Sequence, residues 1–337
     1  MIEKKDLEKC AALIESCRKE MARRITGQKE MIDGLLSALV AGGHILLEGV
    51  PGLAKTLAVK SLAEITGLDF KRIQFTPDLL PADLTGTMIW EQSQGSFSVR
   101  RGPIFANVIL ADEINRAPAK VQSALLEAME EKQVTIGNTS YPLPSPFFVL
   151  ATENPIEHEG TYSLPEAELD RFLMKLLVVY PQPVEELDIV KNSAPLAADS
   201  GESRKPLKPV LTHDALIFLR DAADSVHIDE EISKYIVSVV TATRPAPTRT
   251  HTGAGQPKEG VYRYVSFGAS PRASIALYRC CRILAMFEGR NYVSPEDVKT
   301  CAYPVLRHRI VLSYEAEAEG MDADAVISRI LSHVPVP

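Results

Sequence analysis

Five short apolar runs, separated by helical stretches and turns, mark the chain between residues 45 and 180. They lie at residues 44–47, 72–75, 108–111, 147–152 and 176–179. Runs that are apolar on consecutive positions suit strands that are buried on both faces of a sheet. The pattern therefore predicts an α/β fold with a parallel sheet that is flanked by helices.

Helical periodicity marks both ends of the chain. Near the N-terminus, apolar residues recur at steps of three and four, the spacing of one helix face, at Leu7, Cys10, Ile14, Cys17 and Met21. Later helical patterns cover residues 212–223, 230–243, 271–287, 295–306 and 323–333. Two of them begin with Ser-Pro, a capping hydroxyl followed by proline at the first helical position. The chain is therefore expected to end in an all-helical domain.

Two stretches inside the α/β region, residues 87–100 and 133–143, alternate polar and apolar positions around Ser-Gln-Gly-Ser and Gly-Asn. Such alternation around a turn is typical of β-hairpins. Both hairpins are expected to project from the α/β core.

Residues 181–209 shift in composition to Pro, Ser, Ala and Lys and lack periodicity, which is typical of a linker. We therefore expect an α/β core over residues 1–183, a linker over 184–210 and the helical domain over 211–337. A Gly/Pro/Thr-rich stretch at residues 245–260 is expected to form a loop within the helical domain.

Composition and charge narrow the classes of protein. The 337 residues suffice for about two domains of ~150 residues, and 45% apolar with 24% charged residues is typical of globular proteins. A net charge of -7 argues against a surface that grips nucleic acid throughout. No segment approaches the ~20 apolar residues of a membrane helix, and the N-terminus lacks the apolar core of a secretory signal, so we expect a cytoplasmic protein. The cysteines and histidines lack zinc-ligand spacing.

Residues 46–56 read LLEGVPGLAKT, a buried strand followed by a glycine-containing turn and an apolar-periodic helix. Backbone amides at such a turn surround a phosphate, the lysine reaches the β and γ phosphates of a nucleotide, and the threonine hydroxyl binds Mg²⁺. The predicted phosphate-binding residues are Gly49, Val50, Pro51, Gly52, Leu53, Ala54, Lys55 and Thr56. Ala54 stands where the usual pattern has its last glycine, and its methyl group is expected to fit with a negative φ.

Two further apolar runs end in polar residues. Asp112 and Glu113 follow one strand, where Asp112 is expected in the Mg²⁺ shell and Glu113 is expected to polarise the attacking water. Asn154 follows another and is placed to orient water or to contact the γ-phosphate, although a plain turn residue is the alternative.

The segments GVPGLAKT, ILADEINRAP, ATENP, LPEAELDRF and GASPRAS occur in this order and together resemble AAA+ ATPases of the MoxR family. The resemblance covers the chain from residue 25 to its end. It implies a P-loop core with a five-stranded parallel sheet, a C-terminal helical lid domain, and subunits arranged in a ring.

The resemblance also implies roles for single residues. Residues 25–28, including Gln28, would lie near the adenine, and Asn154 would be the first sensor residue. Arg171 would be an arginine finger that stabilises charge on a neighbouring subunit's nucleotide, with pairing to Glu168 or Asp170 as the alternative. Arg272 would be the second sensor residue.

Arg116 has two open interpretations, another trans-acting arginine or a cap of the helix that follows. The two hairpins would face the pore of the ring. Trp90 and Phe97 would then contact the substrate, with ordinary cross-strand packing as the alternative.

The function that follows is hydrolysis of ATP with Mg²⁺ by a homo-oligomeric, hexameric ring that acts as a chaperone on a protein client. The resemblance points to a partner with a von Willebrand factor A domain and to metal or cofactor insertion or the maturation of complexes. One alternative is a magnesium-chelatase-like motor subunit. Another is a nucleic-acid-translocating motor, which is disfavoured because the hairpin tips SQGS and GNTS are neutral.

Overall fold

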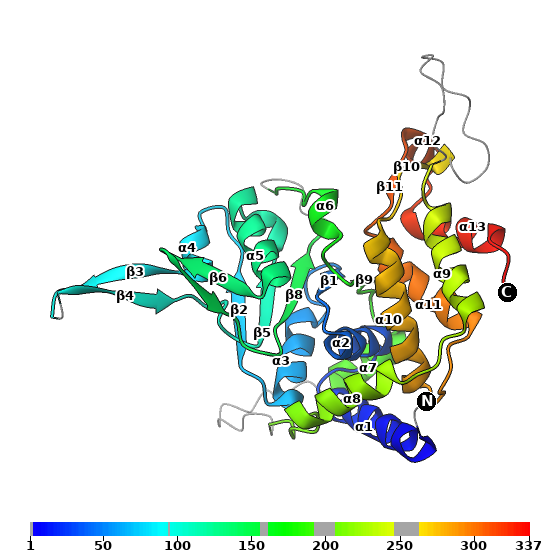
Figure 1. The fold of residues 1–337 in the computed structure, drawn as a ribbon, viewed down its shortest axis with the longest axis horizontal. Helices are drawn as coiled ribbons and strands as arrows, with labels where there is room; N and C mark the ends of the chain where they lie inside the picture. Colours follow the sequence, from blue (N-terminus) through cyan, green and yellow to red (C-terminus); the bar gives the residue numbers. More distant parts are fainter. Residues whose placement is uncertain (1–2, 94, 156–160, 192–205, 246–262) are drawn as a thin grey trace. The chain divides into compact units, whose positions relative to one another are not determined.

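The structure is a computed structural model that describes residues 3–93, 95–155, 161–191, 206–245 and 263–337 (Figure 1). The chain forms two compact units. The sheet unit contains Ala12–Leu164 and Leu176–Phe218, and the helical unit contains Met1–Ala11, Pro165–Lys175 and Leu219–Pro337. Each unit is described by itself below.

A five-stranded sheet with the order β2-β5-β8-β1-β9 forms the centre of the α/β fold. Neighbouring strands run parallel in the pairs β2–β5, β5–β8 and β8–β1. The strands are β1 (Ile45–Glu48), β2 (Phe70–Gln74), β5 (Val108–Asp112), β8 (Phe148–Glu153) and β9 (Met174–Leu177). All five predicted strands are confirmed, and β5 is buried at every position because helices cover both faces of the sheet.

Helices flank the sheet in chain order. They are α1 (Lys4–Ala22), α2 (Lys29–Ala41), α3 (Lys55–Thr66), α4 (Pro81–Thr85), a 3-10 turn η1 (Ile114–Arg116), α5 (Ala119–Glu131) and α7 (Pro183–Lys191). The apolar face predicted for α1 is confirmed, since Cys10, Ile14, Cys17 and Met21 are fully buried. Within the described ranges no helix is both long and apolar enough to cross a membrane.

The two predicted hairpins are confirmed as β3 (Gly86–Glu91) with β4 (Ser96–Arg101), and β6 (Gln133–Ile136) with β7 (Thr139–Pro142). Figure 1 shows β3–β4 extending away from the sheet. Trp90 lies directly opposite Phe97, with the rings edge to face at 5.1 Å, yet the residues are 55% and 61% exposed. Cross-strand packing therefore holds the two rings together and leaves much of both exposed.

Helices dominate the part of the chain after residue 211. They are α8 (His213–Asp224), α9 (Glu230–Ala242), α10 (Pro271–Phe287), α11 (Pro295–Leu306), α12 (Tyr314–Ala318) and α13 (Ala323–His333). The helical unit also contains the short helix α6 (Glu166–Leu169). Both predicted serine caps are confirmed, at Ser270 for α10 and Ser294 for α11.

The expectation of an all-helical C-terminal domain is wrong in one detail. Antiparallel strands β10 (Val265–Phe267) and β11 (Val311–Leu312) pair across about 45 residues of chain. Strands of two or three residues carry too little alternation to be found in a sequence. The expected loop at residues 245–260 lies, from residue 246 on, outside the described residues.

Part of the predicted linker is helical. Helix α7 covers Pro183–Lys191, so residues 184–191 are regular, whereas residues 192–205 lie outside the described residues. Val184, Leu187 and Val190 of α7 are exposed, so the helix lacks the buried apolar stripe on which helix prediction rests. The domain bounds at residues 183 and 211 stay a prediction.

His44 is a buried polar residue that joins α5 to the sheet. Its Nε2 lies 3.2 Å from the carbonyl oxygen of Met129, and the backbone N–H of Val149 donates to its Nδ1 over 3.0 Å. This pattern requires a neutral ring with its proton on Nε2. Burial lowers the pKa of His44 from 6.5 to about 4.

Because the folded protein keeps His44 neutral, the unfolded chain takes up a proton first as the pH falls. The stability that His44 contributes is therefore present above about pH 6.5 and is lost between about 6.5 and 4. In that window we expect the free energy of unfolding to fall by up to about 1.4 kcal/mol per pH unit. Urea unfolding of the parent and of His44→Gln, which does not titrate, measures the difference, and equal pH slopes would contradict this account.

Candidate nucleotide-binding site

The loop between β1 and α3 has the strand-turn-helix geometry that a phosphate site requires. A Cβ atom on Gly49 would lie 2.7 Å from the carbonyl oxygen of Val178, so only glycine fits there. Gly52 has a φ of +89°. Lys55 and Thr56 are the first residues of α3, where unpaired backbone N–H groups and the helix dipole favour an anion.

Ala54 departs from expectation. It has a φ of +57° and a ψ of 19°, the left-handed region, so the expectation of a negative φ is wrong. The chain must turn at this position to enter α3, and it does so at a cost of about 1–2 kcal/mol for a residue with a Cβ atom. Ala54 is the N-cap of α3 and makes no side-chain capping bond.

Lys55 lies among carboxylates at the carboxyl edge of the sheet. Its Nζ donates to the carbonyl oxygen of Gly49 and, over 3.4 Å, to that of Glu153. Burial lowers the pKa of Lys55, while the nearby charges of Asp112, Glu113 and Glu48 act in the opposite direction. The ammonium group therefore closes the loop upon itself in the absence of a phosphate.

Asp112 accepts hydrogen bonds on both carboxylate oxygens. Arg72 of β2 donates to Oδ2 from Nε over 2.9 Å and from Nη2 over 2.6 Å. The hydroxyl of Thr152 donates to Oδ1 over 2.6 Å and accepts from the backbone N–H of Glu113 over 2.8 Å. Side chains of β2, β5 and β8 are thus joined through one carboxylate.

Glu113 follows β5 in a left-handed conformation with a φ of +57°. Its Oε2 accepts from Nε2 of Gln74 over 2.7 Å and from Nη1 of Arg116 over 3.0 Å. Arg116 therefore pairs with Glu113 of its own chain, an arrangement that neither of the two sequence interpretations included. The pair is partly exposed, so other partners can compete for it.

Asn154 lies at the same edge. It directly follows β8 and is 5% exposed. The carbonyl oxygen of the preceding Glu153 accepts from the backbone N–H of Gly49 over 3.3 Å, which fixes the end of β8 against the phosphate loop. Lys55, Asp112, Glu113 and Asn154 are therefore brought to one edge of the sheet, as predicted.

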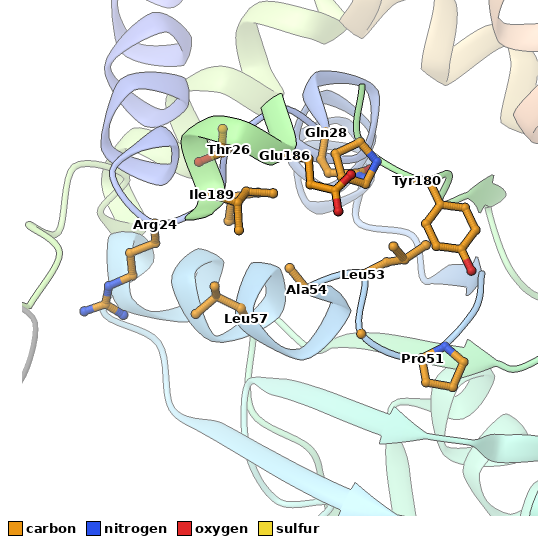
Figure 2. Close-up of a pocket in the computed structure, with 13 residues that line it drawn as sticks. Arg24, Thr26, Gln28, Pro51, Leu53, Ala54, Leu57, Tyr180, Glu186 and Ile189 are labelled. Carbon is orange, nitrogen blue, oxygen red and sulfur yellow. The ribbon is translucent and has the colours of Figure 1, made fainter. Parts of the chain in front are cut away.

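A pocket of about 400 Å³ adjoins the loop (Figure 2). Figure 2 shows Leu53, Ala54 and Leu57 on one side and Tyr180, Glu186 and Ile189 on the other. Residues 24–28 complete the lining, which consists of Arg24, Ile25, Thr26, Gln28, Pro51, Gly52, Leu53, Ala54, Leu57, Tyr180, Pro181, Glu186 and Ile189. Nε2 of Gln28 donates to the carbonyl oxygen of Val179 over 2.7 Å. An apolar pocket beside a phosphate loop suits the base and ribose of a nucleotide.

The residues present fit Mg²⁺ bound together with phosphates. Thr56 offers a hydroxyl and Asp112 a carboxylate, and Mg²⁺ takes few protein oxygens together with waters and phosphates. Because Arg72 already bonds to Oδ2 of Asp112, Mg²⁺ can reach this oxygen only through water or after Arg72 moves. In the described part of the chain no group of three or more His, Cys, Asp or Glu side chains could hold a metal ion.

Arg171 and Arg272 belong to the helical unit. Arg171 follows α6, and Arg272 is the second residue of α10. The alternative that Asp170 serves as a partner for Arg171 gains no support, because the carboxylate of Asp170 accepts from Arg309 and Ser270 instead. Nη1 of Arg272 lies 4.0 Å from Oδ2 of the same Asp170.

Comparisons with known proteins agree with this geometry. A family model described as ATPase family associated with various cellular activities (AAA) matches residues 44–174, and one described as AAA lid domain matches residues 260–330. Chaperone MoxR1 of Mycobacterium tuberculosis is 47% identical over 94% of this chain and 81% of that protein. The chain belongs to the MoxR family of AAA+ ATPases.

Two further similarities extend over almost the whole MoxR-family chain. The uncharacterized protein YeaC of Bacillus subtilis is 45% identical over 94% of this chain and 92% of that protein. A crystal structure of a candidate ATPase from Cytophaga hutchinsonii has a TM-score of 0.86 and 47% identity, and covers 99% of this chain and 97% of that one.

The sequence interpretation missed two groups of site residues. Arg72, Gln74 and Thr152 bond to the acidic pair but lie inside strands, where sequence alone gives no sign of a partner on the next strand. Glu186 and Ile189 of α7 line the pocket but fell in the predicted linker. The apolar positions of PVEELDIVK were the signal that could have revealed α7.

Replacing Ala54 by glycine removes the cost of the left-handed conformation, against which the unfolded chain gains freedom. We therefore expect the free energy of unfolding to change by less than about 1 kcal/mol. The matched control is Ala12→Gly, at an exposed position of α1, where a right-handed helix should lose about 1 kcal/mol. Urea unfolding measures both changes, and an equal loss at both positions would contradict the conformation assigned to Ala54.

Proposed function

We propose that this MoxR-family protein hydrolyses Mg²⁺-bound ATP as a ring of identical subunits and acts as a chaperone on a protein client. The observation that carries the proposal is the convergence of the phosphate loop, Asp112, Glu113 and Asn154 at one sheet edge beside a pocket of about 400 Å³. Membership of the AAA+ family and the name of the similar Chaperone MoxR1 support it.

In this proposal the chain's own groups bind and orient the nucleotide. The amides of residues 49–56 and Nζ of Lys55 hold the phosphates, which requires Lys55 to leave the carbonyl oxygens that it now contacts. Thr56 and Asp112 would hold Mg²⁺, whose positive charge offsets the charge on the phosphate oxygens. The pocket lined by Gln28 and Leu57 receives the base and ribose.

Glu113 would orient the attacking water, with Asn154 beside the γ-phosphate. A carboxylate oxygen that accepts from both Gln74 and Arg116 is a poor base, because both bonds favour its charged, unreactive state. Hydrolysis therefore requires Glu113 to exchange at least one of these partners for water. This arrangement keeps turnover low until nucleotide or a neighbouring subunit rearranges the edge of the sheet.

We further propose that Arg171 reaches the nucleotide of a neighbouring subunit in a hexameric ring and that Arg272 reaches the nucleotide of its own subunit. An arginine supplied across an interface stabilises the charge that develops on the γ-phosphate, so that hydrolysis depends on assembly. The exposed rings of Trp90 and Phe97 would contact the client in the pore. The expected partner carries a von Willebrand factor A domain, the expected task is metal or cofactor insertion or complex maturation, and the expected compartment is the cytoplasm.

ATP turnover measured against protein concentration tests the proposal, with light scattering on the same samples to follow assembly. Specific activity should rise as larger species form, because Arg171 acts in trans. Glu113→Gln and Arg171→Ala should each lower turnover by at least about 100-fold while a fluorescent ATP analogue still binds. The control Arg23→Ala removes a surface arginine paired with Glu20 and should leave turnover unchanged.

Turnover that is independent of concentration and unaffected by Arg171→Ala would refute the trans-acting role. Loss of analogue binding in Glu113→Gln would instead show that Glu113 holds the site together rather than acting on water.

Arg72→Ala tests the metal site. Removing the guanidinium frees Oδ2 of Asp112, so the Mg²⁺ concentration for half-maximal turnover should fall about two- to fivefold. Lys71→Ala, at the exposed neighbouring position of β2, is the control and should leave the Mg²⁺ requirement unchanged. An unchanged or higher requirement in Arg72→Ala would show that Asp112 does not serve Mg²⁺ in the way proposed.

A further inference from the structure

Asp170 holds together the two chain segments of the helical unit that carry Arg171 and Arg272. Its Oδ1 accepts from Nε of Arg309 over 2.8 Å, and its Oδ2 accepts from the hydroxyl of Ser270 over 2.7 Å. The side chain of Asp170 is 16% exposed and that of Arg309 only 2%. A carboxylate this well enclosed and bonded on both oxygens has a fixed position.

Arg309 binds the backbone on both sides of Arg171. Its Nη2 donates to the carbonyl oxygens of Asp170 and Phe172, and its Nη1 donates to that of Leu173 over 3.1 Å. Nε2 of His308 lies 3.1 Å from the carbonyl oxygen of Phe172. Burial keeps the pKa of His308 well below its usual value, so its ring is neutral and donates one hydrogen bond. The peptide units around Arg171 are therefore anchored to the segment after α11.

Ser270 links the same carboxylate to Arg272. Its hydroxyl donates to Asp170 and accepts from the backbone N–H of Arg272 over 3.1 Å, as the N-cap of α10. The guanidinium of Arg272 lies 4.0 Å from Oδ2 of Asp170. A negative charge at the N-terminus of this 17-residue helix is also favoured by the helix dipole. The start of α10 therefore cannot shift without disturbing Asp170.

We propose that Asp170 is a positioning residue that makes Arg171 and Arg272 move as one body. This inference rests on the proposed function, in which Arg171 serves a neighbouring subunit's nucleotide and Arg272 serves the nucleotide of its own subunit. Any displacement of α10 that follows from the state of one nucleotide is then transmitted to the arginine that acts on the next. Asp170 thereby couples adjacent sites around the ring without touching either nucleotide.

Mixed rings test the coupling. Glu113→Gln subunits cannot hydrolyse but can supply Arg171, so mixing them with Arg171→Ala subunits should restore turnover at least tenfold over either variant alone. Asp170→Asn subunits mixed in the same way should not recover, because both their Arg171 and their own Arg272 are misplaced. Recovery equal to that of Arg171→Ala would overturn the coupling, since Asp170 would then act on Arg171 alone.

Binding of a fluorescent ATP analogue gives a readout that does not depend on turnover. Asp170→Asn should weaken binding by the same factor as Arg272→Ala, and the double variant should be no weaker than Arg272→Ala alone. The matched control is Asp324→Asn, which disrupts the Asp324–Arg307 pair in the same unit and should leave binding and turnover unchanged. Affinity equal to that of the parent in Asp170→Asn would overturn the proposal.

Ser270→Ala keeps the proposal testable if Asp170→Asn does not fold, because it cuts the link to α10 and leaves the Asp170–Arg309 pair intact. It should reproduce the loss of recovery in mixed rings, whereas Ser294→Ala, which removes the cap of α11, should not. Equal effects of the two variants would reduce Ser270 to an ordinary helix cap and overturn the coupling. Failure of the Arg171→Ala mixture itself to recover would refute the trans role of Arg171, and the coupling with it.

Discussion

The meeting of strand ends at one edge of the parallel sheet is the constraint on which the candidate site depends. Strands β1, β5 and β8 are buried along their lengths, so each can present polar groups only where it ends. Thr152 then fixes the edge, because one hydroxyl joins the carboxylate of Asp112 to the backbone of Glu113. Loss of this register would scatter the groups that the site needs.

Charged groups of the site are already paired within the chain. Lys55 contacts carbonyl oxygens, Asp112 pairs with Arg72, and Glu113 pairs with Arg116. Such pairing offsets the cost of placing charges in a partly buried edge before any ligand arrives. A nucleotide must therefore exchange partners rather than fill prepared gaps, and the free energy of that exchange becomes available to change the conformation.

The helical unit uses a different device for the same purpose. Arg309 is almost fully buried and bonds to backbone carbonyls as well as to Asp170, so a short irregular segment acquires the rigidity of a helix. Burial of a charge is costly unless it is fully bonded, and here every bond falls on the segment that carries Arg171. The two units thus hold their arginines and carboxylates by networks rather than by single contacts.

The sequence alone predicted the five strands, both hairpins and most of the helices, because their periodicities follow directly from burial on one or two faces. It also predicted the phosphate loop and the acidic pair, whose chemistry is contained in a few consecutive residues. The partners of those residues were decided by tertiary structure, since Arg72 lies 40 residues from Asp112 and Arg309 lies 139 from Asp170. The left-handed conformation of Ala54 was likewise set by the turn that packing imposes, against the preference of alanine itself.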